Sequence, residues 1–171
     1  MKLAVIVGIL LLAVGSADAQ QKGAAAGTAT AIQVLTQSKL EVGDVPGHEL
    51  AQAVGDDVLK TPDRIAGVPF DGAKVRILKQ SDLVNGGAGV VRGYATWEAT
   101  TGQKLFVIYG YAVPPFLPGK DAAPFEGTFE WLGGTGSLAG VRGNGTMEGE
   151  VTRRGETKYR WAGSYEQSSG K

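Results

Sequence analysis

The chain has 171 residues, with 17 basic and 17 acidic side chains, 27 glycines and no cysteine. The lack of cysteine excludes disulfides, thiolate zinc sites and cysteine nucleophiles. The balanced charge, with no long run of either sign, argues against nucleic acid and against an anionic membrane as the main partner.

The N-terminus has the pattern of a secretory signal peptide. A short positive start is followed by an apolar run from Leu3 to Val14 and by the small-x-small triplet Ala17-Asp18-Ala19. The run is shorter than the ~20 residues that cross a bilayer. We therefore predict a cleaved signal peptide over 1–19, a secreted or periplasmic location and no membrane insertion. A first core helix or an uncleaved anchor is the alternative.

Residues 20–44 follow as a tract that begins with small side chains and has little to bury. The composition predicts a flexible leader over 20–30 and either an edge strand or a short helix over 31–42. A single β-barrel domain is expected over 45–168, because about 150 mature residues suit one domain with a sizeable core.

Strand patterns begin at His48. We expect a strand over 48–54, a polar loop or helical turn over 56–66, and alternating strands over 72–80 and 90–99. Asn85-Gly86-Gly87 between the alternating strands is a strong hairpin signal, because Asn and Gly tolerate the positive φ of a tight turn.

The second half continues in the same way. Residues 105–112 are apolar on both faces, which predicts a strand covered on both sides, and 113–124 hold four of the seven prolines, which predicts a loop. Further strands are expected over 125–132, 142–151 and 157–166. The last of them places Tyr159, Trp161, Gly163 and Tyr165 on one face. Seven or eight strands without crossover helices favour an all-β sandwich or barrel over an α/β fold. An outer-membrane barrel is less suited, because paired aromatic girdles and uniform spacing are missing.

The most glycine-rich segment lies between two of these strands. Gly133-Gly134-Thr135-Gly136 precedes Leu138-Ala139-Gly140-Val141, and no ionisable side chain occurs before Arg142. Glycine permits the positive φ and close approach that a strongly curved sheet needs where it turns. We expect this segment to bend the chain between two barrel strands and to keep Leu138 and Val141 in the core.

The segment from Gly133 to Gly143 resembles the signature of allene oxide cyclase-like barrels and, more distantly, of dirigent proteins. The hairpin residues from Asp82 to Gly89, Gly93-Tyr94 and the segment from Phe106 to Gly110 are similar to the preceding hairpins of bacterial members. The resemblance covers roughly residues 68–150. It implies an all-β, closed, antiparallel eight-stranded barrel of the calycin-like kind with a hydrophobic cavity. It does not imply the activity, since no position matches the cyclase's catalytic Glu or the acids of the dirigent pocket.

Candidate catalytic groups are few. His48 is the only histidine, and no Gly-x-Ser-x-Gly elbow is present. We expect His48 to be a strand-end or surface histidine, with a proton shuttle as the alternative. The acidic residues have no metal-ligand spacing, so no metal site is predicted. Strand carboxylates are expected mostly to face solvent and to pair with Lys158 or Arg160, whereas one inside the lumen would act as an acid or base. The strand carboxylates are Glu98, Glu126, Glu130, Glu148 and Glu150.

The strand aromatics are the candidate ligand-binding set. They either fill the barrel core or line a cavity, since an eight-stranded barrel is at the size where side chains fill the interior or leave room for one small ligand. The proline-rich loop would stand at the rim, with Phe116 and Leu117 as exposed tips. The cavity candidates are Trp97, Tyr109, Tyr111, Trp131, Tyr159 and Trp161.

Three functions remain open. The first is an exported monomeric or homodimeric barrel that binds a small hydrophobic molecule, without a cofactor and without a covalent mechanism. The second is a cyclase or isomerase that works by templating in the cavity, for which the sequence assigns no catalytic residue. The third is a structural or envelope protein whose barrel is filled by its tryptophans.

Overall fold

The computed structural model describes residues 21–85 and 87–168, and these form a closed ring of eight long antiparallel strands. The strands are β1 (Gln21–Glu41), β2 (His48–Lys60), β5 (Lys74–Val84), β6 (Ala88–Glu98), β7 (Lys104–Val113), β8 (Ala122–Gly134), β9 (Val141–Thr152) and β10 (Thr157–Gln167). Each pairs with its neighbours along the chain, and β1 closes the ring by pairing with both β2 and β10. The predicted all-β eight-stranded barrel is confirmed.

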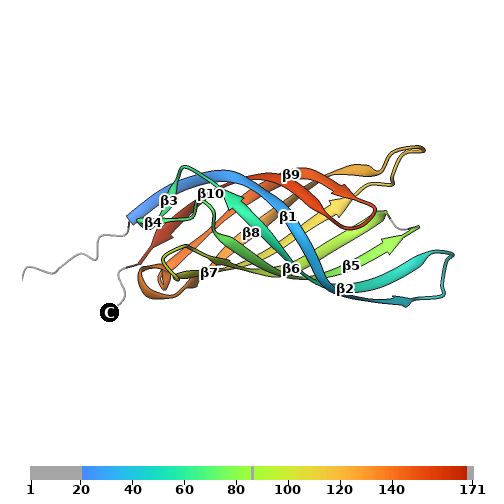
Figure 1. Ribbon diagram of the computed structural model, residues 1–171, viewed down its shortest axis with the longest axis horizontal. Helices are drawn as coiled ribbons and strands as arrows, with labels where there is room; N and C mark the ends of the chain where they lie inside the picture. Colours follow the sequence, from blue (N-terminus) through green and yellow to red (C-terminus); the bar gives the residue numbers. More distant parts are fainter. Residues whose placement is uncertain (1–20, 86, 169–171) are drawn as a thin grey trace, which may run out of the picture.

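The two ends of the barrel differ. A small hairpin of β3 (Arg64–Ile65) and β4 (Val68–Pro69) lies at one end, which we call the closed end (Figure 1). Ile65 and the following Phe70 are fully buried there, and the Ala66 N–H donates a 2.9 Å hydrogen bond to the Tyr165 hydroxyl. The opposite, open end carries the β1–β2 and β9–β10 turns and the β7–β8 loop (Figure 1).

The strands alternate between the interior and the outer surface as their sequences predict. On β6 the side chains of Val91, Ala95 and Trp97 are buried, and on β10 those of Trp161 and Tyr165 are buried. Their neighbours along each strand face outward, which the period of two in a β-strand requires. The predicted alternation of both strands is confirmed, and the aromatic face of β10 points inward.

The N-terminal part of the barrel differs from the sequence prediction. Residues 21–41 form the single strand β1, so the flexible leader over 20–30 and the helix alternative over 31–42 are wrong for the described residues. Ala25 and Ala29 are buried, and a Cβ at Gly27 would meet the Lys60 carbonyl oxygen and the Trp161 ring. Small side chains are therefore what this strand needs in order to lie over a bulky neighbour. The predicted signal peptide over 1–19 lies outside the described residues.

The predicted polar loop over 56–66 is also wrong in its first part, because β2 continues to Lys60. Asp56 and Asp57 are adjacent acids that point to opposite sides of this strand. Asp56 faces outward and pairs with Arg76, whereas the Asp57 side chain is buried in the barrel. A pair of aspartates suggests a loop, but here the strand's alternation separates them.

Two smaller predictions, on the exposure of β7 and on the length of the β7–β8 connection, are wrong. β7 is not covered on both sides, since Phe106 on its outer face is exposed. β8 begins at Ala122, so the proline-rich connection is shorter than predicted and spans 114–121.

The glycine-rich turn after β8 has the predicted structural role. β8 ends at Gly134, and a short 3₁₀ turn, η1 (Gly136–Leu138), leads into β9. Gly136 has a φ of 59°, a conformation that side chains rarely adopt, while Leu138 and Val141 are fully buried. The expected bend with both apolar side chains in the core is confirmed.

Candidate functional site

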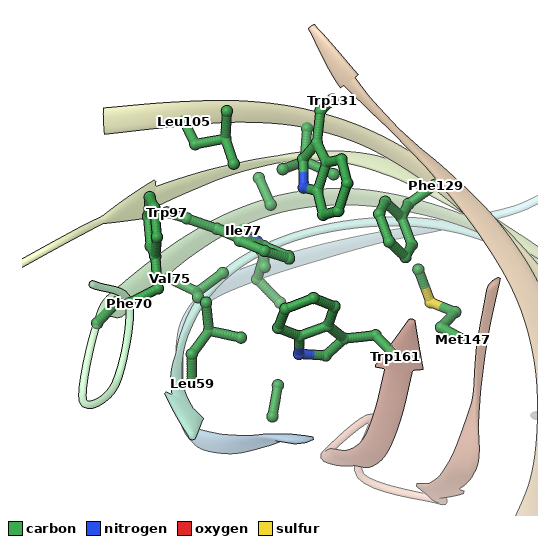
Figure 2. Close-up of a cluster of buried hydrophobic side chains, with 14 of the residues drawn as sticks. Leu59, Phe70, Val75, Ile77, Trp97, Leu105, Phe129, Trp131, Met147 and Trp161 are labelled. Carbon is green, nitrogen blue, oxygen red and sulfur yellow. The ribbon is translucent and has the colours of Figure 1, made fainter. Parts of the chain in front are cut away.

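The half of the barrel near the closed end is filled by aromatic rings. The centroid of the Trp97 ring lies 5.0 Å from that of Trp161 and 6.2 Å from that of Trp131, in tilted and edge-on contacts. Figure 2 shows the three rings and Phe129 converging on one point from β6, β8 and β10. The three tryptophans predicted to line a cavity therefore contact one another, and this half of the barrel has the filled core of the third hypothesis.

Beyond this cluster, toward the open end, lies an interior cavity of about 30 Å³. Trp97 and Trp161 form part of its wall, and the remaining aromatic side chains come from β7, β8 and β10. The Tyr111 and Phe125 rings are in close contact, with centroids 4.3 Å apart. Tyr109 and Tyr159 complete this wall, so the structure brings five of the six predicted cavity residues to one space, and Trp131 lies behind it.

Two buried charged side chains face the same cavity, and the sequence prediction missed both. Asp57 on β2 is 1% exposed and Lys79 on β5 is 8% exposed. The Asp57 Oδ1 atom has no hydrogen-bond partner among the described residues. The Lys79 Nζ atom donates a 2.8 Å hydrogen bond to the carbonyl oxygen of Gly155 in the β9–β10 turn. The signal was the alternation itself, since Lys79 continues the inward row of Val75 and Ile77.

Burial governs the ionisation of this site. It raises the pKa of the Asp57 carboxyl to about 6, although the nearby Lys79 ammonium acts in the opposite direction. Burial likewise lowers the pKa of Lys79, while attraction to Asp57 opposes the change. The pKa values of the Tyr109, Tyr111 and Tyr159 hydroxyls are raised by burial, which keeps these groups protonated at neutral pH. The cavity thus presents the Asp57 carboxyl group, the Lys79 amino group and several neutral hydroxyls in an otherwise apolar setting.

A second hollow of about 140 Å³ forms the mouth of the barrel at the open end. Lys79 and Tyr111 line both the mouth and the interior cavity, so the two spaces are adjacent. The rim carries Arg153, whose guanidinium carbon lies 4.6 Å from the centre of the Phe116 ring and whose Nε donates to the Lys120 carbonyl oxygen. Phe116 is partly buried against the core and lines the mouth, whereas Leu117 is 66% exposed.

Other candidates do not belong to this site. His48 bridges two carboxylates, with Nδ1 2.6 Å from Asp44 Oδ1 and Nε2 2.7 Å from Asp82 Oδ1, and these contacts raise its pKa, that with Asp82 most. Within residues 21–85 and 87–168 no group of three or more His, Cys, Asp or Glu side chains is arranged to hold a metal ion. The strand acids Glu98 and Glu148 are exposed and pair with Lys104 and Arg160.

Two larger hollows, of about 510 and 540 Å³, lie on the outer wall. They are troughs between outward side chains such as Leu78 and Tyr94 and contain no buried charged group. We therefore place the candidate site inside the barrel, where charge and aromatic surface coincide.

In the described residues no helix has the length and apolar character needed to cross a membrane.

Comparison with known proteins supports the fold but identifies no family. No family model matches the chain, and no curated protein matches its sequence. The solved structures that are similar to this chain include two dirigent proteins. The pterocarpan synthase dirigent protein PsPTS1 has a TM-score of 0.51 and 13% identity over 88% of this chain and 97% of its own. The pterocarpan synthase dirigent protein GePTS1 has a TM-score of 0.49 and 10% identity, over 89% and 88%. The chain has a dirigent-like β-barrel fold.

Proposed function

We propose that this protein binds a small aromatic molecule in the open half of its barrel. The ring would occupy the mouth and contact Tyr111 and Phe116, and a smaller polar group would reach the interior cavity. The volume of the mouth supports this proposal. It is about 140 Å³, close to the volume of about 150 Å³ of an apolar cavity engineered in another protein, which binds benzene. The interior cavity of about 30 Å³ accommodates only a group of one or two heavy atoms.

The observation that carries the proposal is the unpartnered Oδ1 atom of Asp57. A buried acceptor without a partner costs free energy, because folding removes it from water without a replacement hydrogen bond. A ligand hydroxyl that donates to Asp57 would supply this bond. The ligand class is therefore a single ring that carries a hydrogen-bond donor.

Titration of the protein with para-cresol and with toluene tests the proposal, with tryptophan fluorescence as the readout, because Trp97 and Trp161 line the cavity. We expect para-cresol to bind and toluene to bind at least about tenfold more weakly, since toluene leaves Asp57 unpaired. Ala95→Leu, which fills the interior cavity, should abolish binding, whereas Ala112→Leu on the outer wall should not. The absence of saturable binding for both compounds would refute the proposal.

Asp57 also favours a second candidate function, an isomerase or cyclase. A carboxyl group with a pKa of about 6 exchanges protons readily near neutral pH, and it lies in an enclosed apolar space. Asp57 would give a proton to one atom of the substrate and take one from another, which isomerises the substrate without a co-reactant. Asp57→Asn would then retain ligand binding but lose turnover, whereas an unchanged rate would exclude the role.

We further propose that the mature protein is exported, on the strength of the apolar run from Leu3 to Val14 and the cleavage pattern at Ala17-Asp18-Ala19. N-terminal sequencing of the protein from the extracytoplasmic fraction should begin at Gln20. Recovery of the uncleaved chain from the cytoplasm would contradict export.

A further inference from the structure

We infer that the ligand of this site is an aryl carboxylate, whose acidic group lies at the barrel mouth between Lys79, Arg153 and Arg154. The inference rests on the proposed function and adds a substrate class to it. The ring faces Tyr111 and Phe116, the carboxylate meets the three cations, and the hydroxyl end points toward Asp57.

The charges that line the mouth carry the inference. Four are basic, Lys39, Lys79, Arg153 and Arg154, and only Glu49 is acidic. The Glu49 carboxylate is occupied by Lys39, whose Nζ lies 2.7 Å from its Oε2. Among the ion pairs of residues 21–85 and 87–168 none includes the other three cations. The mouth is thus a small concave space with an excess of three positive charges.

Lys79 has the strongest requirement for an anion. Its ammonium is buried and carries three N–H donors, of which one bonds to the Gly155 carbonyl oxygen. A buried cation without an anionic partner is unfavourable, and the lowered pKa of Lys79 reflects this cost. The charge of Asp57 acts on Lys79, but the two side chains form no direct ion pair among the described residues. A ligand carboxylate at the mouth would complete the coordination of Lys79.

Arg153 is already oriented for the same role. Its side chain packs against the Phe116 ring and is held by a 3.2 Å hydrogen bond from Nε to the Lys120 carbonyl oxygen. Among residues 21–85 and 87–168 no other hydrogen bond or ion pair holds this guanidinium. A planar guanidinium recognises a carboxylate through two parallel hydrogen bonds. Because the ring and the cation are packed together at the rim, an aromatic acid would contact both at once.

The test compares para-hydroxyphenylacetate with para-hydroxyphenylacetamide, which has nearly the same shape without the charge. Calorimetric titration should show that the acid binds about tenfold or more tightly than the amide. The double variant Arg153→Gln, Arg154→Gln should remove this preference, so that the ratio of the acid's affinity to the amide's affinity falls to about one. Lys79→Met should also remove the preference for the acid over the amide. If this variant does not fold, the arginine double variant alone tests the proposal. Arg160→Gln, which alters an arginine paired with Glu148 on the outer wall, is the matched control.

The outcomes separate the two proposals. Equal affinities for acid and amide would overturn the acidic class while leaving the proposed function intact. A lack of binding by either compound would overturn both. A preference for the acid that survives in the arginine double variant would overturn the assignment to the mouth. Competition by inorganic sulfate at the same concentration as the acid would show a simple anion site and would also overturn it.

Discussion

The Lys79 side chain on β5 reaches across the open half of the barrel and donates a 2.8 Å hydrogen bond to the Gly155 carbonyl oxygen in the β9–β10 turn. This contact joins strands that are not neighbours in the ring. Lys79 lines both the interior cavity and the mouth, so it stands at the boundary between them. In the proposed function, a ligand that enters from the open end would pass this side chain on its way to the interior cavity.

Asp57→Asn should change how stability depends on pH. The pKa of Asp57 is about 6 in the folded protein and about 3.8 when exposed, so the folded state holds the proton more tightly. The contribution of Asp57 to stability is therefore greatest below pH 4 and falls as the pH rises through 6. The variant lacks this loss, and its stability relative to wild type should rise by roughly 2–3 kcal/mol between pH 4 and pH 7.

Urea unfolding at the two pH values measures this difference. Asp56→Asn is the matched control and should behave in the opposite way. A hydrogen bond from Arg76 lowers the pKa of Asp56, so its contribution is present above pH 4 and is lost on acidification. Parallel curves for wild type and Asp57→Asn would show that Asp57 is not buried in the folded state.

His48 should stabilise the open end in a pH-dependent manner. Its pKa is raised by Asp82 and Asp44, so the stabilisation is complete below about pH 6.5 and is lost as the pH rises through the higher folded value. His48→Gln should therefore cost more at pH 6 than at pH 9. NMR titration is direct, because the chain has a single histidine. A titration midpoint at or below 6.5 would contradict the two-carboxylate arrangement.

Valine at Gly134 or Gly136 should destabilise the fold by about 2–4 kcal/mol. A side chain at Gly134 would collide with the Lys104 carbonyl oxygen, and Gly136 has a positive φ of 59°. Trp131→Ala should cost about 3–5 kcal/mol, since the ring is buried in the cluster. Gly110→Ala is the control, because a Cβ there meets only ordinary contacts, the nearest at 3.6 Å. Thermal unfolding compares them, and a wild-type Tm for either valine variant would refute the strain argument.

The two tips of the β7–β8 loop should differ in their effect on binding. Phe116 lines the mouth and packs under Arg153, so Phe116→Ala should weaken para-cresol binding about fivefold or more. Leu117 is exposed and does not line the mouth, so Leu117→Ala should leave the affinity unchanged. Replacement of residues 114–118 by Gly and Ser should reproduce the Phe116→Ala effect with little change in Tm. Equal affinities for all four proteins would show that the loop is only a connector.

The sequence predicted the barrel strands well where apolar and polar side chains alternate strongly. It predicted them poorly where the buried side chains are small, as in β1, or where two acidic residues are adjacent, as at Asp56 and Asp57. β6 and β10 alternate large apolar and polar side chains, so the two faces of each strand were predicted correctly. The first half of β1 was missed because its buried positions are Ala25 and Ala29, whose small side chains carry little hydrophobic signal. The edge-strand alternative over 31–42 is confirmed, since residues 31–41 belong to β1 and pair with β2 alone.

The candidate site was predicted in its aromatic part and missed in its charged part. Tyr109, Tyr111 and Tyr159 were identified because they lie at strand positions, and side chains either fill the interior of a barrel of this size or line a cavity in it. Asp57 and Lys79 were missed for a physical reason. Charged side chains are almost never buried without a partner, so the alternation that points them inward was outweighed by their charge.

Methyl NMR of the protein labelled at its methionine methyl groups tests the central claim most directly, because Met147 lines the interior cavity. On titration with para-cresol, the Met147 methyl signal should shift in a saturable manner and show nuclear Overhauser contacts to the ligand's protons. Both effects should vanish in Ala95→Leu and persist in Ala112→Leu. A Met147 signal that stays unchanged while para-cresol binds elsewhere would contradict the account.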